Sequence, residues 1–475
     1  MRYSASDNYF QSWSTSAYAN DDFRAAAGLT INVGLRYEYF APYTEERGHL
    51  ADLAVSPGFT AVSVVTAGEA SPYSGSLPTS IVRPQPKDFS PRLGIAWRPS
   101  QKRGMIIRSG YSIFYSGSSY AQIAGSMAGQ PPFATTGTFT NTTAAPFSMQ
   151  DAFLSAPSST LTNTYAIDPN FRIAYAQTWN FSIQNTLPGG FVVDTEYIGT
   201  KGTHLGVLEN PNRSTGTVGQ QQLNIADATN FTYQTYGANS IFNAGQVRVT
   251  RFLSRSVSAS ILYTFSKSID NASSFSGTGG TAVQYLDDWH LERGLSSFDQ
   301  RHHLTATMQF SSPVGIRGFL RGGGWRATLL KSWNLQTTFT ATSGTPLTAY
   351  ISGNLSNTAG LASSGNLRAE ATGLPIAGAD GAYFNTAAFT TPPAGQFGDA
   401  GRDTIPGLFV TTLNASLNRS FTFSRRRLAF NLVASNALNH VTITSIGTTV
   451  NAANYGLPTA ASATRSVTLN MRFNF

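Results

Sequence analysis

The sequence predicts an all-β protein: an antiparallel up-and-down transmembrane β-barrel with about 13 to 14 strands. Three observations predict this fold. Segments of alternating apolar and polar residues recur along the chain, and the connections between them alternate between short and long. Charged residues make up only 12% of the chain, whereas soluble proteins average about 25%. No continuous apolar run reaches the roughly 20 residues that a membrane-spanning helix needs.

The last segment, residues 465–475, shows the alternation most clearly. Its apolar residues are Val467, Leu469, Met471, Phe473 and Phe475, and polar residues stand between them. Successive side chains of a strand point to opposite faces, so one face of this strand is apolar. An outer-membrane strand turns such a face to lipid. We therefore expect these five residues to form the strand through which the barrel-assembly machinery inserts the protein, with outer-membrane lipids around it.

About twelve other segments repeat this alternation. They lie near residues 9–23, 29–40, 89–98, 107–115, 175–184, 191–197, 247–249, 257–266, 304–310, 333–341, 413–417 and 428–434. Most approach the length of about 10 residues that a tilted barrel strand requires. No shift in composition divides the chain, so residues 1–475 are expected to form one outer-membrane β-barrel domain.

The connections alternate in length along the chain. The long ones cover residues 41–88, 116–171, 199–243, 268–301, 344–408 and 439–464, and the short ones lie near 24–27, 99–104, 188–190, 254–255 and 423–426. The 312–329 connection is intermediate and falls among the short ones by its order. Membrane barrels have short periplasmic turns and long extracellular loops. The long connections are therefore expected outside the cell, and Phe475 in the periplasm.

Charged residues within the segments stand at the polar positions, which predicts that they face the barrel lumen. These lumen-facing candidates are Arg36, Glu38, Arg92, Arg108, Asp194, Glu196 and Arg248. An Arg or Lys facing lipid at the bilayer midplane would cost about 2–4 kcal/mol. Two roles remain open for these residues: they line a path for a substrate, or they form salt bridges that face a plug.

Aromatic residues at or near the expected strand ends have two interpretations. Trp97, Trp179, Trp333, Tyr39 and Tyr115 could bind sugars. The interfacial girdle that membrane barrels carry is the better explanation, because every such barrel needs one.

Composition and spacing argue against several other functions. The chain has no cysteine, so no thiol nucleophile or cysteine metal site is possible. The net charge is +8, but the basic residues are scattered, so we expect no nucleic-acid partner. The Gly-rich stretches 277–280 and 322–324 match no phosphate-binding template, and no GxSxG elbow is present. We therefore expect no enzyme activity and no cofactor.

The loop from Asp287 to His303 is the one stretch whose residue types would suit a metal ion. It contains acidic residues and histidines, but their spacing matches no known metal motif. His302 and His303 are adjacent, so they should point to opposite faces of a strand. Solvated loop groups that pair with Arg293 and Arg301 are the favoured interpretation, and no metal site is predicted.

The first residues, MRYSASDNYFQSWSTS, contain no apolar h-region of a secretory signal. A count of thirteen strands would start the chain outside the cell, whereas single-chain bacterial barrels have even strand numbers. Both observations lead us to expect an N-terminally truncated chain.

Several motifs resemble TonB-dependent receptors of the Oar-like type, and together they cover nearly the whole chain. They are TINVGLRYEYF at 30–40, SPRLGIAWRP at 90–99, YIGTKGTHL at 197–205, YTFSKSIDNASSF at 263–275, ERGLSSFDQRHHL at 292–304, SGTPLT at 343–348, FNTAAFTTPPAGQFGDAGRDTIPG at 384–407, SNALNH at 435–440 and the terminal strand.

This resemblance implies an outer-membrane transport barrel, usually of twenty-two strands, closed by an N-terminal plug whose TonB box couples uptake to the inner membrane. This sequence shows neither plug nor TonB box, so the expectation is the C-terminal part of such a barrel, in which the TonB system acts only through an upstream plug. A bulky ligand such as a glycan or a peptide would be taken up. A passive porin or structural surface barrel is the alternative, and a secreted β-sandwich adhesin is a third hypothesis.

Overall fold

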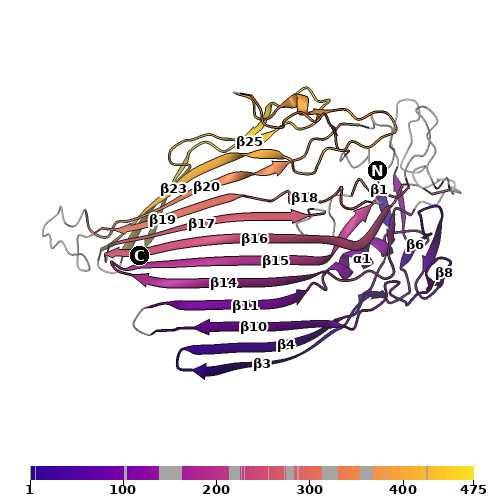
Figure 1. Ribbon diagram of the computed structural model, residues 1–475, viewed down its shortest axis with the longest axis horizontal. Coiled ribbons are helices and arrows are strands. Elements are labelled where there is room, and N and C mark those ends of the chain that lie inside the picture. Colours follow the sequence, from indigo (N-terminus) through magenta and orange to yellow (C-terminus); the bar gives the residue numbers. More distant parts are fainter. Residues whose placement is uncertain are drawn as a thin grey trace.

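The computed structural model describes residues 2–5, 7–100, 104–138, 163–212, 225, 227–228, 230–254, 256–271, 273, 283–285, 288–312, 330–353, 367–379, 381–423 and 426–475. A single large sheet dominates them, with fifteen strands among these residues. Its long strands run side by side across the molecule, and small hairpins gather at one end (Figure 1).

Thirteen of these strands follow one another in the sheet in chain order. They are β3 (Ser14–Ala26), β4 (Leu29–Phe40), β10 (Asp88–Trp97), β11 (Ile106–Tyr115), β14 (Tyr175–Leu187), β15 (Phe191–Glu209), β16 (Thr232–Ser254), β17 (Val257–Asp270), β19 (His302–Ser311), β20 (Asn334–Leu347), β23 (Ile405–Phe423), β24 (Arg426–Ser435) and β27 (Ser466–Asn474). Each pairs antiparallel with the next, which is an up-and-down meander. The thirteen segments found in the sequence correspond to these thirteen strands.

The remaining elements are short and lie mainly in the long connections. They are β1 (Arg2–Ala5), β2 (Phe10–Gln11), β5 (Thr44–Glu45), β6 (Ala51–Val55), β7 (Val62–Thr66), β8 (Ala70–Ser71), β9 (Gly75–Ser76), α1 (Ser119–Ala128), β12 (Thr135–Thr138), β13 (Tyr165–Ile167), β18 (Gly294–Leu295), β21 (Glu370–Ala371), the 3-10 helix η2 (Thr386–Ala388), β22 (Phe389–Thr390), β25 (Ile443–Ile446) and β26 (Pro458–Ala461). Strand β13 pairs with β16, and β18 pairs with β17.

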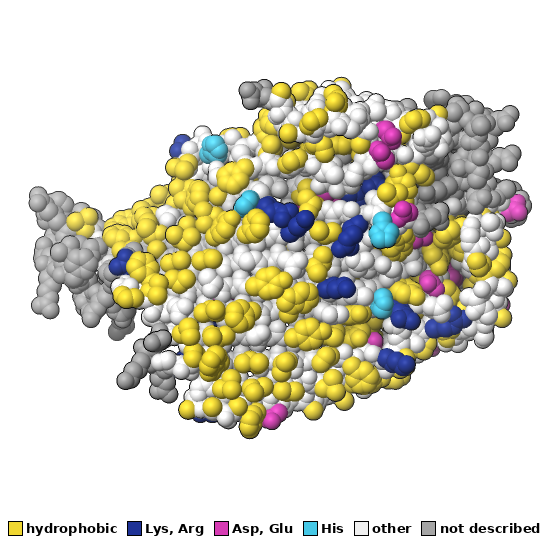
Figure 2. Space-filling model, viewed as in Figure 1, with side chains coloured by type: hydrophobic (Ala, Val, Ile, Leu, Met, Phe, Trp, Pro, Cys, Tyr) yellow, Lys and Arg dark blue, Asp and Glu magenta, His cyan; other side chains and the backbone are white. Residues whose placement is uncertain are grey.

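The strand register places the apolar side chains of neighbouring strands on one shared face. Tyr111 stands opposite Leu93 on one side and Trp179 on the other. Phe181 stands opposite Tyr197 in the next pair. Many side chains of this apolar face are exposed, with exposed fractions from 36% at Phe310 to 63% at Met471. Figure 2 shows the resulting hydrophobic surface spread over the strands.

This exposure decides against the β-sandwich hypothesis, because a sandwich buries the apolar face of each sheet against the other. The buried apolar clusters lie instead in the connections and at the strand ends beside them. One surrounds α1 and includes Ile123, Met127 and Phe171, and another includes Ile351, Phe384 and Ile405. Among the described residues, the large sheet therefore does not bury its apolar face in a core, as the sheets of soluble proteins do. An exposed apolar face of this extent indicates a surface that contacts a membrane or another protein.

The long connections all leave one end of the sheet and the short turns the other (Figure 1). The C-terminus lies at the short-turn end, as expected from the order of connections. Four of the predicted terminal residues, Val467, Leu469, Met471 and Phe473, lie in β27 on the apolar face, opposite apolar residues of β24. Phe475 follows the strand and is almost fully exposed.

The predicted limits of some strands were wrong. Residues 199–209 and 232–243 were expected in a long loop, but they extend β15 and β16. Where a strand extends beyond the lipid, both of its faces contact water or loops. Its sequence then need not alternate between apolar and polar residues, so the pattern does not reveal the strand. The helix α1 within the 116–171 connection was also not anticipated.

Trp179 was expected at or near a strand end, but it lies inside β14. It packs over Gly199 of the neighbouring strand, where an added methyl group would stand 2.1 Å from the indole. A residue without a side chain therefore makes room for the indole in the middle of the sheet. Trp97 and Tyr115 do end their strands, and Tyr39 is the last but one residue of β4.

Along the described residues, no ladder joins β3 to β27, so the sheet has two edges. No helix in the described part of the chain has the length and apolar character that crossing a membrane would require.

Candidate functional site

The polar face of the sheet carries all seven charged candidates. They alternate with the apolar residues along their strands: Arg36, Glu38, Arg92, Arg108, Asp194, Glu196 and Arg248. Asp194 stands directly opposite Arg248, and Arg108 stands opposite Ser182. The structure thus gathers them on one face over five strands. Their role in lining a lumen stays a prediction.

The charged groups of this face are held by separate local contacts. The Arg36 Nε lies 3.0 Å from the Glu38 Oε1, and 41% of the Arg36 side chain is exposed. Arg108 donates a hydrogen bond of 3.1 Å to the Gln184 Oε1. The Arg92 guanidinium lies 5.2 Å from the centre of the Phe114 ring, which also points to the polar face. Exposed ion pairs contribute only about 0–1 kcal/mol to folding stability. These contacts therefore orient the side chains more than they stabilise the fold.

A hollow lies on this face between Arg92 and Glu196, with a volume of about 400 Å³. Two glycines, Gly94 and Gly110, leave its floor open. A methyl group on Gly110 would stand 2.7 Å from the Asn180 Oδ1, so the Asn180 side chain would have to shift to admit it. Asn180 in turn donates a hydrogen bond of 3.3 Å to the Glu196 Oε1.

Most of the side chains around this hollow can form hydrogen bonds. Asn32, Ser112, Thr178 and Thr200 offer hydroxyl and amide groups, and the apolar residues at its border are Leu93, Tyr111, Trp179 and Ile198. A cation and a carboxylate stand among them. The arrangement therefore suits a hydrated, hydroxyl-rich or amide-rich ligand, and among the described residues it brings together no nucleophile and base of a catalytic site.

The loops at the long-connection end are joined by a buried ionic network. The Arg368 Nη2 lies 3.1 Å from the Glu292 Oε1, and both side chains are 4% exposed. The Arg402 Nη2 lies 3.0 Å from the Asp270 Oδ1. Gln284 donates a hydrogen bond of 2.8 Å to the Gly398 carbonyl. This loop network ties the connection after β17 to the connection after β20.

The loop 287–303 differs partly from its prediction. Asp299 does pair with Arg301, at 3.6 Å. Glu292 was expected to be a solvated group, but it is buried, and its partner is Arg368, 76 residues away. Arg293 donates to the Asn239 side chain instead of pairing with an acid. A loop carboxylate can be buried when it pairs with a cation that is distant in the sequence. The spacing of residues within the loop does not reveal such a partner.

His302 and His303 lie on opposite faces of β19, as predicted. The His302 Nδ1 is 2.8 Å from the Tyr263 hydroxyl on the apolar face, whereas His303 lies opposite Thr264 on the polar face. Within the described residues, no group of three or more His, Asp or Glu side chains is placed to hold a metal ion. Asp287, the stretches 277–280 and 322–324, and most of the turn 101–104 lie outside the described residues.

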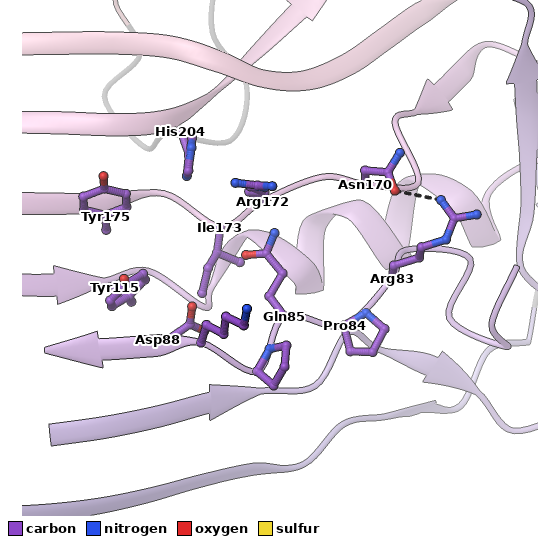
Figure 3. Close-up of a pocket in the computed structure, with 12 residues that line it drawn as sticks. Arg83, Pro84, Gln85, Asp88, Tyr115, Asn170, Arg172, Ile173, Tyr175 and His204 are labelled. Carbon is purple, nitrogen blue, oxygen red and sulfur yellow. Dashed lines mark hydrogen bonds between the residues drawn. The ribbon is translucent and has the colours of Figure 1, made fainter. Parts of the chain in front are cut away.

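A second cavity, of about 570 Å³, lies where β10, β11, β14 and β15 meet the loops. Figure 3 shows Tyr115 and Tyr175 on one side of this rim pocket and Arg83 on the other, with His204 and Arg172 between them. Arg83 is fixed, because it donates to the Asn170 Oδ1 at 2.8 Å and to the Ser74 and Ser76 carbonyls. No sequence motif marks this pocket, since its residues come from four separate segments.

The fold is similar to solved outer-membrane receptors. The outer membrane transporter YddB from Escherichia coli has a TM-score of 0.54 at 10% identity, over 97% of this chain and 54% of that one. The FrpB iron transporter from Neisseria meningitidis has a TM-score of 0.46 at 9% identity, over 98% of this chain and 46% of that one. FpvA from P. aeruginosa has a TM-score of 0.44 at 9% identity, over 98% of this chain and 38% of that one.

This chain therefore spans about half the length of the transporter YddB. At such low identity the likeness concerns the fold alone, which is that of an outer-membrane transporter barrel. Among curated proteins, none shows significant sequence similarity to this chain.

The sequence also matches a family model, described as the outer membrane beta barrel domain, over residues 2–468. This match covers almost the whole chain, and it agrees with the exposed apolar face and the up-and-down order of the strands. The chain belongs to the outer-membrane β-barrel family and is a protein of the outer membrane.

Proposed function

We propose that this chain forms the wall of a TonB-dependent transport barrel, which takes up a bulky polar ligand without covalent chemistry. The hollow between Arg92 and Glu196 is the observation that supports this most directly. It lies on the face opposite the apolar one, so in a closed wall it would face the interior. Barrel interiors are polar in channels and transporters of this type.

The class of ligand follows from the groups around the hollow. Amides, hydroxyls and one charge of each sign favour a glycan or a peptide over an apolar compound, because buried hydrogen-bonding groups select ligands that pair with them. The proposal gives the chain no enzymatic role and no nucleic-acid partner.

Two further partners belong to this proposal. The four apolar-face residues of β27, together with Phe475, would be the strand that the barrel-assembly machinery reads during insertion. The TonB system would act on the barrel through a plug.

Uptake in whole cells tests the proposal. Cells that make the full gene product would be given a labelled maltodextrin mixture or a labelled oligopeptide pool, with tonB intact and with tonB inactivated. The proposal expects accumulation that requires tonB and that falls when Arg92→Trp fills the hollow. Flux that is equal in both strains would instead identify a passive pore.

A matched control keeps this experiment specific. Arg426→Trp changes a basic residue at the short-turn end of β24, away from the hollow. It should leave accumulation unchanged. Equal loss of accumulation in both variants would show that bulky substitutions disturb assembly. The experiment would then no longer support a role of the hollow in uptake.

A further inference from the structure

The rim pocket lies at the border between two kinds of surface. Tyr115 and Tyr175 stand opposite each other, with ring centres 5.4 Å apart, and they continue the apolar-face positions of β11 and β14. Beyond them the pocket is lined by Arg83, Lys87, Arg172 and His204, with Asp88 as its acidic residue. The pocket therefore begins where the lipid-facing surface ends on the loop side.

Two of these cations are free to meet a ligand. Lys87 and Arg172 are exposed, and within the described residues neither lies within ion-pair distance of a carboxylate. The Arg172 guanidinium lies 5.9 Å from the centre of the Tyr236 ring, and His204 contacts the same ring edge-on at 5.6 Å. Aromatic contacts thus hold Arg172 and His204 in place, while the charge of Arg172 and the ring nitrogens of His204 stay available.

The basic character continues along the same border. Lys201 in the middle of β15 and Lys267 near the loop end of β17 are exposed and occupy apolar-face positions. His302 takes the corresponding place on β19. Figure 2 shows Lys, Arg and His side chains gathered between the hydrophobic surface over the strands and the loops.

Directly along the same strands lies an apolar hollow. It has a volume of about 250 Å³ and is lined by Leu93, Tyr111, Trp179, Phe181 and Tyr197. Trp179 and Tyr111 are each four residues from the rim tyrosine on the same strand, which is about 13 Å along a strand. The cationic rim pocket and the apolar hollow are thus neighbours on one continuous face of the sheet.

We infer that the rim pocket binds the phosphorylated headgroup of an outer-leaflet glycolipid, whose acyl chains lie in the apolar hollow. The occupant must carry a negative charge for Lys87 and Arg172, and acyl chains for the hollow. A phosphate accepts hydrogen bonds from several donors at once, which suits a group of Arg, Lys and His side chains. The position at the long-loop end places the headgroup on the outer leaflet, because long loops are extracellular in this architecture.

Lipid retention by the purified chain tests the inference. The protein, folded in detergent, would be incubated with lipid A that carries both phosphates or with enzymatically dephosphorylated lipid A, and bound lipid would be counted by native mass spectrometry. Wild type should retain the phosphorylated form preferentially. The double variant Lys87→Gln/Arg172→Gln should lose about tenfold or more in retention, since each basic residue near an anionic surface contributes about fivefold.

A variant at the opposite end of the sheet is the control for lipid retention. Arg426→Gln removes a basic residue at the opposite end of the sheet and should retain lipid as wild type does. Equal retention of dephosphorylated lipid A would overturn the inference, as would equal loss in the control. Complete displacement by inorganic phosphate would also overturn it, because the pocket would then serve a soluble anion.

Folding is checked in the same samples. Lys87 and Arg172 are exposed, so their replacement should leave the thermal unfolding temperature unchanged. If the double variant unfolds early, the single variant Lys87→Glu replaces it, because charge reversal at one exposed position must still weaken binding of a phosphate. Unchanged retention in a folded Lys87→Glu protein would contradict the inference.

Discussion

Ile261 shows at a single residue how a strand of this protein meets its surroundings. Its side chain is 48% exposed, and it stands opposite Val249 and Ala306 on the apolar face. Thr264, three residues further along β17, lies on the polar face opposite Gln246 and His303. The two positions therefore belong to one strand and to opposite environments.

Substitution of each by arginine should separate these environments. Ile261→Arg is expected to destabilise the folded protein by about 2–4 kcal/mol in a bilayer, because the charge would face lipid. Thr264→Arg should cost much less, since its side chain lies on the polar face. Urea unfolding in lipid vesicles measures both. Equal destabilisation by the two variants would contradict the assignment of faces.

Among the elements, the buried pair of Arg368 and Glu292 shows why the loops are ordered. Both groups have lost their hydration, and several hydrogen bonds replace it: Glu292 also accepts from the backbone of Gln284 and Tyr285. Arg368 donates to the Leu291 carbonyl as well. Such a pair is sensitive to the removal of one partner, because the other charge stays buried.

Arg368→Ala should therefore destabilise the joined loops by about 3–5 kcal/mol. Limited proteolysis of the folded protein would show faster cleavage within the loops, while the sheet stays intact. Arg47→Ala is the control, because the Arg47–Asp7 pair is mostly exposed and should change cleavage little. If both variants were cleaved at the wild-type rate, the loop network would not be what orders the loops.

The same loops should respond to pH through Asp403. Burial raises the pKa of Asp403 from 3.8 to about 6, although Arg402 and the Thr348 hydroxyl oppose the shift. A raised pKa means that the folded loop binds the proton more tightly than the unfolded loop does. The stability that this carboxyl contributes is thus complete below about pH 4 and is lost as the pH rises through about 6.

Asp403→Asn should flatten this dependence. In wild type, protection of the loops against hydrogen exchange is expected to fall between about pH 4 and about pH 6, once intrinsic exchange rates are corrected. The variant should keep nearly constant protection over that range, because its amide does not titrate. A variant that loses protection just as wild type does would assign the effect to another group.

The sequence predicts these elements unevenly, for physical reasons. Every long strand of the sheet could be predicted, because lipid on one side demands strict alternation, as in residues 465–475. Residues 199–209 of β15 and 232–243 of β16 were missed because these parts of the strands extend beyond the lipid, where the sequence need not alternate. The partner of Glu292 and the four segments of the rim pocket were missed because they come together only through the fold.

For the molecule as a whole, one feature organises the structure. Many large apolar side chains of the sheet are exposed, whereas the buried apolar clusters lie in the loops and at the strand ends beside them. This is the reverse of a soluble β protein, in which sheets bury their apolar faces. It explains the family assignment, the polar hollow on the opposite face and the basic border that meets the headgroups.

Site-directed spin labelling of β17 in lipid bilayers tests this organisation most directly. The chain has no cysteine, so single cysteines at 260–265 can be labelled without background. Labels at Ile261, Tyr263 and Phe265 should collide with oxygen, which dissolves in lipid, and labels at Ser260, Leu262 and Thr264 with a water-soluble nickel complex. Collision rates without this two-residue alternation, or with the two sets exchanged, would contradict the account.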